Sequence, residues 1–189
     1  MSWEPMSLAN IAADELGADV ATVHVAGLLE DDEHHLTGVE VIVAAGMAIA
    51  AAFCIGLVQG IVDEARQGTA HSSRSADPTA WGHGTGAVLV RQLRHLVHRF
   101  TRRSEDTSSE DAVHDDEDPK IQFSILVTTV RENLIENRIE ILQLEVAAEK
   151  SKVEVVGILT DLGLRPGRAE ALAPRLTQAL LRELTESMT

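Results

Sequence analysis

An uninterrupted apolar segment constrains what this chain can fold into more than any other feature. Between Glu40 and Asp63 lie 22 residues, and Gln59 is the only strongly polar one among them. At about 1.5 Å per residue, a helix of this length covers the roughly 30 Å of hydrocarbon in a bilayer. Lipid offers no hydrogen bonds to the backbone, so a single span must be helical. The sequence therefore predicts a transmembrane helix over 41–62.

The alternative is a buried helix of a water-soluble protein. Such a helix needs neighbours on all of its sides. The rest of the chain predicts only two or three amphipathic helices, which is few for surrounding it. This shortage favours the membrane interpretation.

Small residues recur on one side of the apolar segment. Gly56 and Gly60 form a GxxxG pair, and Gly46 with Ala50 extends the same four-residue spacing. Small residues on one face let another helix backbone approach closely. The pattern predicts helix pairing through Gly56 and Gly60, although a general abundance of Gly and Ala would produce it too.

Charge is divided into blocks along the chain, whose formal net charge is −14. Residues 1–65 carry −11, residues 66–103 carry +6, residues 104–118 carry −8, and residues 119–189 carry −1. Basic residues flanking a span stay on the cytoplasmic side. We therefore expect the amino terminus outside and the carboxyl terminus in the cytoplasm.

Composition favours packed helices over a sheet. Aromatic residues make up only 3% of the chain, so its core must be built mainly from aliphatic side chains. The expected fold class is all-α: one transmembrane helix plus a cytoplasmic helical hairpin or coiled coil, joined by disordered linkers. The expected segments are an acidic amino-terminal segment (1–40, with a short helix over 7–17), the span (41–62), a linker (63–86), a basic amphipathic helix (87–103), an acidic disordered linker (104–119) and the hairpin (120–189).

The basic amphipathic helix has apolar residues at helical spacing between Val88 and Phe100. Helices of this kind lie on anionic membrane surfaces. The residues expected at the membrane surface are Arg91, Arg94, Arg99, Arg102 and Arg103. The alternative is a packed helix whose basic face pairs with the acidic segment 104–118. Nucleic acid is not an expected partner, because the chain is acidic overall.

The hairpin is predicted from a heptad seam that runs from 121 to about 162. Further apolar residues widen this seam, so the helix can pack on more than one partner: Ile135, Ile139, Leu142 and Val146. Gly163 to Gly167 predicts a turn. A second helix is expected over 168–186, kinked or restarted at Pro174. We expect the hairpin to pack on itself or to form a homo- or hetero-oligomer.

Five carboxylates lie along the predicted long helix: Glu132, Glu136, Glu140, Glu145 and Glu149. Four-residue steps stack them on shared faces of a helix. Stacked carboxylates repel one another unless a cation neutralises them, and hard divalent metals prefer oxygen ligands. The pattern predicts a divalent-metal site, with a solvated face of intrahelical salt bridges as the alternative.

Motifs of catalysis are missing from the sequence. It contains no nucleophile elbow, phosphate-binding glycine loop, CxxC pair or HExxH motif. We expect no catalytic activity, and no cofactor other than the possible divalent metal.

Two stretches of the chain match the motifs of a known protein family, in the same order along the sequence. The first is Glu-His-His-Leu-Thr-Gly-Val-Glu-Val-Ile at 33–42, continued by Gly46-Met47 and the Ala-Ala-Phe of 51–53. The second contains Glu-Val-Val-Gly-Ile-Leu at 154–159, Gly-Leu at 163–164 and Ala-Leu-Leu-Arg-Glu-Leu at 179–184. Together they resemble the vacuolar iron transporter family, the first its entry to the first span and the second its cytosolic metal-binding helices.

The resemblance implies metal binding by the carboxylate helix, but not independent transport. Such transporters have five spans, whereas this chain predicts one. The acidic residue of the family's first span has no counterpart here, because Ala48 and Ile49 follow Met47.

Three functions follow as hypotheses. The first is a non-catalytic single-span membrane protein whose helical hairpin makes it an assembly or regulatory subunit of a membrane complex. The second is a divalent-metal (iron or manganese) binding or transport component that resembles the iron transporter family. The third is a soluble helical protein whose apolar helix is buried.

Overall fold

The computed structural model describes residues 3–20, 38–68, 85–101 and 118–188, and every secondary-structure element in those ranges is a helix. The helices are α1 (Met6–Val20), α3 (Gly38–Gly68), α4 (Thr85–Thr101), α5 (Pro119–Glu136), α6 (Ile141–Asp161) and α7 (Pro166–Met188). The expected all-α class is confirmed. The expected acidic linker lies almost wholly outside the described residues.

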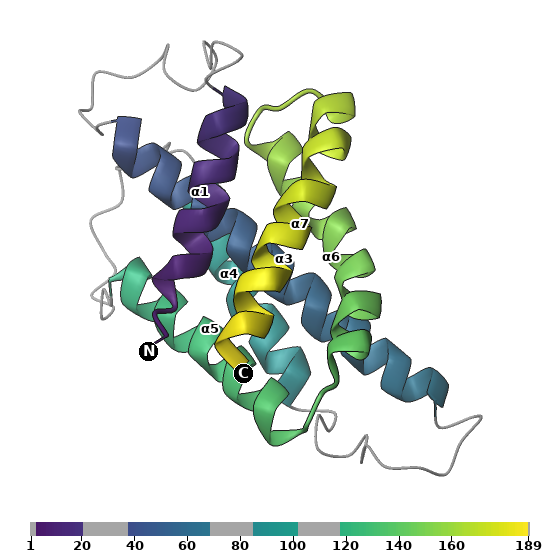
Figure 1. Ribbon diagram of the computed structural model, residues 1–189. Coiled ribbons are helices and arrows are strands. Elements are labelled where there is room, and N and C mark those ends of the chain that lie inside the picture. The colour runs from purple at the N-terminus through teal and green to yellow at the C-terminus, as the bar shows by residue number, and fades with distance from the viewer. Residues whose placement is uncertain (1–2, 21–37, 69–84, 102–117, 189) are drawn as a thin grey trace.

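The apolar helix α3 runs through the middle of the bundle (Figure 1). Its segment Ile42–Glu64 is long and apolar enough to cross a membrane by length and composition, and most of that segment is buried inside the bundle. Helices α1, α4 and α6 make the most extensive contacts with it, and α5 and α7 also touch it. The expectation of too few helices to surround α3 is therefore wrong.

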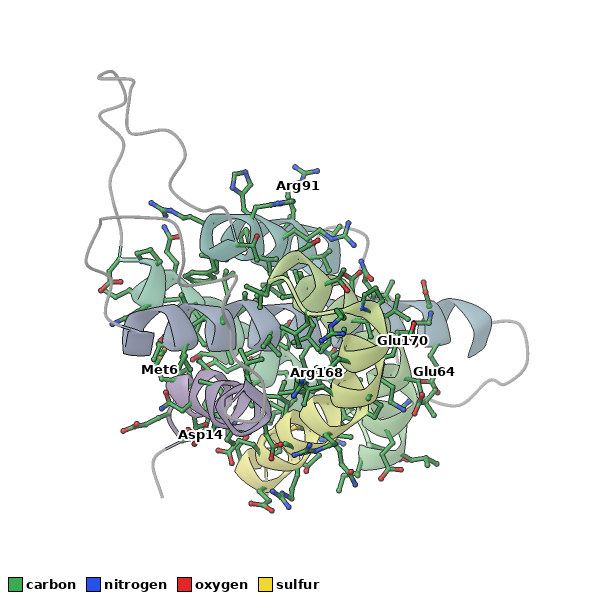
Figure 2. The ribbon with its side chains drawn as sticks, turned by 90° about the horizontal axis from the view of Figure 1, so that it is seen from above. Met6, Asp14, Glu64, Arg91, Arg168 and Glu170 are labelled. Atoms are coloured by element: carbon green, nitrogen blue, oxygen red, sulfur yellow. The ribbon has the colours of Figure 1, made fainter. Side chains whose placement is uncertain are left out.

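Each neighbour of α3 turns an apolar stripe toward it. In α4 the stripe contains Leu89, Leu93 and Leu96, all buried, while Arg91 points away from the bundle (Figure 2). Burial of aliphatic side chains is the main favourable contribution to packing of this kind. The hydrophobic face of α4 is thus covered by protein.

The predicted continuous helix from 121 to about 162 is wrong, because the chain turns between α5 and α6. Arg138 has a φ of 50°, and the Ile139 N–H donates to the carbonyl oxygen of Leu134 at 3.0 Å. This is the left-handed cap that ends many helices. The Glu140 N–H then donates to Oε1 of Gln143 at 3.0 Å, which begins α6. The expected two-helix hairpin is therefore three helices.

Other boundaries follow local signals in the sequence. The side chain of Asp118 accepts from the Lys120 N–H at 2.9 Å and caps α5, with Pro119 as its first residue. Gly163, with a φ of 93°, lies in the predicted turn between α6 and α7. Pro174 lies inside α7, which continues on both sides of it.

Arg131 of α5 connects the two ends of the described chain. Its guanidinium lies 4.9 Å from the centre of the Trp3 ring. Its Nε donates to the Ser187 hydroxyl at 3.2 Å, and the same guanidinium donates to the Ser187 carbonyl oxygen. Figure 1 shows both ends of the chain beside α5.

Candidate functional site

Helices α3 and α6 come within backbone contact where they cross. A Cβ atom added to Gly60 would lie 2.7 Å from Cα of Ala147, and one added to Gly56 would lie 2.8 Å from the backbone nitrogen of Ser151. Both distances are below any normal contact. Only glycine fits at these two positions, so the GxxxG face is occupied by α6 of the same chain.

Ser151 adds a polar contact to this crossing. Its side chain is wholly buried, and its hydroxyl donates to the carbonyl oxygen of Phe53 at 3.0 Å. A buried hydroxyl costs free energy unless it finds a partner, and here the partner lies on the neighbouring helix. The same small-residue packing recurs at Gly46, which faces the backbone of Ala9 and the side chain of Ala13 in α1.

Cys54 lies in the same apolar interior. It is a free cysteine, and burial raises the pKa of its thiol to about 12. The charged thiolate loses its hydration inside the bundle, so the neutral thiol is favoured at physiological pH. In the folded bundle Cys54 therefore contributes apolar contacts as an uncharged thiol.

The five arginines predicted for a membrane surface are differently placed. Arg91 points into solvent (Figure 2), while Arg94 forms an ion pair of 3.1 Å with Glu154 of α6. Arg99 donates to Oε1 of Gln122 in α5 at 3.3 Å. Arg102 and Arg103 lie outside the described residues. Two of these arginines therefore contact neighbouring helices of the bundle.

The five carboxylates predicted for a metal do not share one helix. Glu132 and Glu136 lie on α5, and Glu145 and Glu149 lie on α6. Glu140 lies in the turn between them, so the predicted stack of the first three is interrupted. Among the residues that the structure describes, no group of three or more His, Cys, Asp or Glu side chains is placed to hold a metal ion.

An apolar stripe lies on the outer side of α6, opposite its contact with α3. Leu142, Val146 and Val153 are 67%, 52% and 74% exposed. With Glu149 they follow a 4-3-4 spacing, which keeps them on one face of a helix. We call these four residues the outer stripe. Large apolar side chains that line up in solvent are typical of surfaces that bind other proteins.

Helix α5 carries similar residues on its own outer side. Ile121, Ile125 and Ile135 are all more than one-third exposed. They share the side of α5 that faces away from its buried residues Phe123 and Val130. Most of the large exposed apolar side chains among the described residues therefore lie on α5 and α6.

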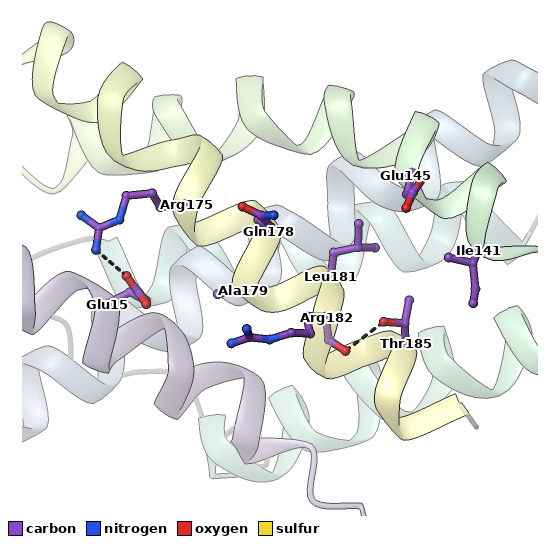
Figure 3. A pocket seen from close by; sticks show the side chains of 9 residues that line it. All are labelled: Glu15, Ile141, Glu145, Arg175, Gln178, Ala179, Leu181, Arg182 and Thr185. Atoms are coloured by element: carbon purple, nitrogen blue, oxygen red, sulfur yellow. Dashed lines mark hydrogen bonds and ion pairs between the residues drawn. The ribbon is translucent and has the colours of Figure 1, made fainter.

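A shallow groove lies between α1, α6 and α7 (Figure 3). An ion pair of 2.9 Å between Arg175 and Glu15 closes one end of it. Glu145 of α6 and Arg182 of α7 also line the groove. The hydroxyl of Thr185 also lines the groove and donates to the carbonyl oxygen of Arg182 at 2.9 Å.

Comparisons with models of known protein families, with curated proteins and with solved structures give no match to this chain. The resemblance to the vacuolar iron transporter family therefore stays a prediction.

The sequence predicts only part of the outer stripe. Leu142 and Val146 are among the residues that widen the predicted seam, whereas Val153 is not. The signal was the second 4-3-4 series, offset from the buried one by about half a turn.

Proposed function

We propose that this chain is a non-catalytic, water-soluble helical bundle that assembles with other helical chains through the outer sides of α5 and α6. In this proposal α3 is the core of the bundle. The observation that carries the proposal is the distribution of exposed apolar residues among the helices. The most apolar helix of the chain is buried, while large aliphatic residues line up in solvent on α5 and α6.

The core role of α3 is supported by the closeness of its packing. Backbone-level contacts at Gly46, Gly56 and Gly60 leave no space for lipid chains on the sides that face α1 and α6. The buried Ser151 hydroxyl is satisfied only while α6 remains against α3. The hydrogen bond of the buried hydroxyl and the close packing of small residues both favour a bundle in which α3 is covered by its neighbours.

Purification without detergent tests the core role. We expect a soluble, helical protein in which the backbone amides of 46–61 exchange hydrogen more slowly than those of α5. Recovery of the chain only from membranes, and only with detergent, would overturn this role.

Gel filtration of an extract of the expressing cells tests the assembly role. We expect elution as a complex larger than the 20.4 kDa monomer. The double variant Val146→Glu, Val153→Glu should elute as a monomer, because a buried charge opposes association. Val88→Glu is the matched control, since Val88 is about as exposed as Val146 but lies on α4. A monomeric wild-type chain in the extract would contradict the proposal.

A second candidate is a single-span membrane subunit, favoured by the length and apolar character of Ile42–Glu64. This function requires the bundle to open, because α1, α4 and α6 occupy sides of α3 that lipid would need. Protease digestion of intact membranes distinguishes it. The amino-terminal end should be cut from outside and residues 118–188 should be protected.

A further inference from the structure

We infer that the partner of the outer stripe is a second copy of this chain, bound with the two α6 helices antiparallel. This inference rests on the proposed assembly function and names its partner. The stripe has the 3.5-residue period that lets two helices pack along their length. Its residues are exposed on the side of α6 opposite α3, so two bundles can meet there without opening.

The sequence of the stripe fits itself in one antiparallel register. When Leu142 lies opposite Val153 of the second copy, Val146 lies opposite the partner's Glu149. The two-fold axis repeats both layers, so the interface contains two Leu–Val layers and two Val–Glu layers. An isologous interface of this kind uses the same patch twice and closes as a dimer.

The charges beside the stripe agree with this register. Glu145 and Lys152 are seven residues apart and therefore lie on the same flank of α6. In the antiparallel pair, Glu145 of each copy meets Lys152 of the other. The opposite flank brings Gln143 to Lys150, so no like charges face each other there. Opposite charges that meet across an interface select the partner and its register.

A parallel pair is disfavoured by the same residues. It would bring Glu149 to Glu149 in the middle of the seam, and like charges that face each other oppose association. In the antiparallel pair each Glu149 faces a valine, and it keeps its own ion pair with Lys152, whose Nζ lies 2.6 Å from Oε1 of Glu149. The antiparallel arrangement places no two carboxylates directly opposite each other in the seam.

Sedimentation of the purified full-length chain from about 1 to 200 µM is the first test, because a single helix pair makes a small and weak interface. We expect a concentration-dependent monomer–dimer equilibrium. Val153→Glu should abolish the dimer, whereas Val88→Glu on α4 should leave it unchanged. Loss of the dimer by Ile125→Glu, with Val153→Glu silent, would overturn the assignment to α6.

Charge reversal tests the register. Glu145→Lys and Lys152→Glu should each weaken the dimer about tenfold or more, because each creates two like-charged contacts. The double swap Glu145→Lys, Lys152→Glu should restore the affinity to within about threefold. If the double swap instead lowers the dimer affinity by the combined effect of the two single variants, the register is overturned.

Cysteine cross-linking in a Cys54→Ala background distinguishes the two orientations. A mixture of chains carrying Leu142→Cys and Val153→Cys should form only mixed disulfides. In the antiparallel pair the two Leu142 positions lie about 16 Å apart along the helix axis, beyond disulfide reach. Cross-linking of Leu142→Cys chains to one another would show a parallel pair and overturn the inference.

Two results distinguish a failure of this inference from a failure of the assembly function on which it rests. A purified chain that is folded and monomeric at 200 µM overturns the second copy as partner. If the same chain still elutes as a large complex in cell extract, the assembly function stands with a different partner.

Discussion

The hydroxyl of Ser151 donates a hydrogen bond to the carbonyl oxygen of Phe53, which lies 98 residues earlier in the chain. Both residues are wholly buried. The bond exists because Gly56, one turn beyond Phe53, lets the backbone of α6 come within contact of α3. This crossing fixes the position of the longest helix of the bundle.

Gly56→Ala should lower the free energy of unfolding by about 1–3 kcal/mol, because the added methyl group meets the backbone of Ser151. Gly157→Ala is the matched control. It lies on α6 with open space around its Cβ position, so it should raise stability by about 0.5–1 kcal/mol through helix propensity. Urea unfolding followed by circular dichroism measures both. Equal effects of the two variants would contradict the close crossing.

Arg138→Gly should stabilise the protein by up to about 1 kcal/mol, since a left-handed conformation costs a side chain about 1–2 kcal/mol and glycine little. Gly163→Ala makes the converse change, at a φ of 93° in the turn after α6, and should destabilise the protein. Thermal unfolding of the two variants checks the prediction. A lower melting temperature for Arg138→Gly would show that the side chain, and not the backbone, stabilises this turn.

Cys54 should resist thiol reagents in the folded protein and react at once in denaturant. Burial raises the pKa of its thiol from 9.0 to about 12. The unfolded chain therefore loses this proton at lower pH than the folded chain. The thiol consequently leaves stability unchanged below pH 9 and lowers it between about pH 9 and 12. Comparing urea midpoints of wild type and Cys54→Ala over this range isolates the effect. Rapid labelling of the native protein would contradict the burial.

Leu93→Ala in α4 should cost about 2–5 kcal/mol, because Leu93 is wholly buried against the bundle. Arg91→Ala should change stability by less than about 0.5 kcal/mol, since Arg91 points into solvent. Denaturant unfolding in the absence of lipid measures the difference. If α4 were a membrane-surface helix, neither variant would alter the stability of the chain without lipid.

Much of the fold is predictable because helical periodicity is strong. The ranges 87–103 and 168–186 correspond closely to α4 and α7. The break at Arg138 is hard to predict, because its turn contains neither glycine nor proline. The signal that was available is Glu140 with Gln143, three residues later, a spacing typical of a helix start.

The surroundings of α3 were harder to predict. An apolar face shows that water is excluded from it, but not whether lipid or another helix excludes the water. Leu89, Leu93 and Leu96 suit either environment, and only the contacts of α4 with α3 decide between them. The outer stripe is ambiguous in a similar way. Its 4-3-4 spacing alone does not show whether these residues are buried against another helix or exposed to solvent.

The central position of α3 has a consequence for the order of synthesis. Helix α3 ends at Gly68, and α6, which packs most extensively on it, begins about seventy residues later, at Ile141. At roughly 5–20 residues per second, a ribosome needs several seconds to make this intervening chain. During that interval the most apolar segment of the nascent protein has left the ribosome without its main cover. Targeting factors and chaperones therefore meet α3 before α6 does.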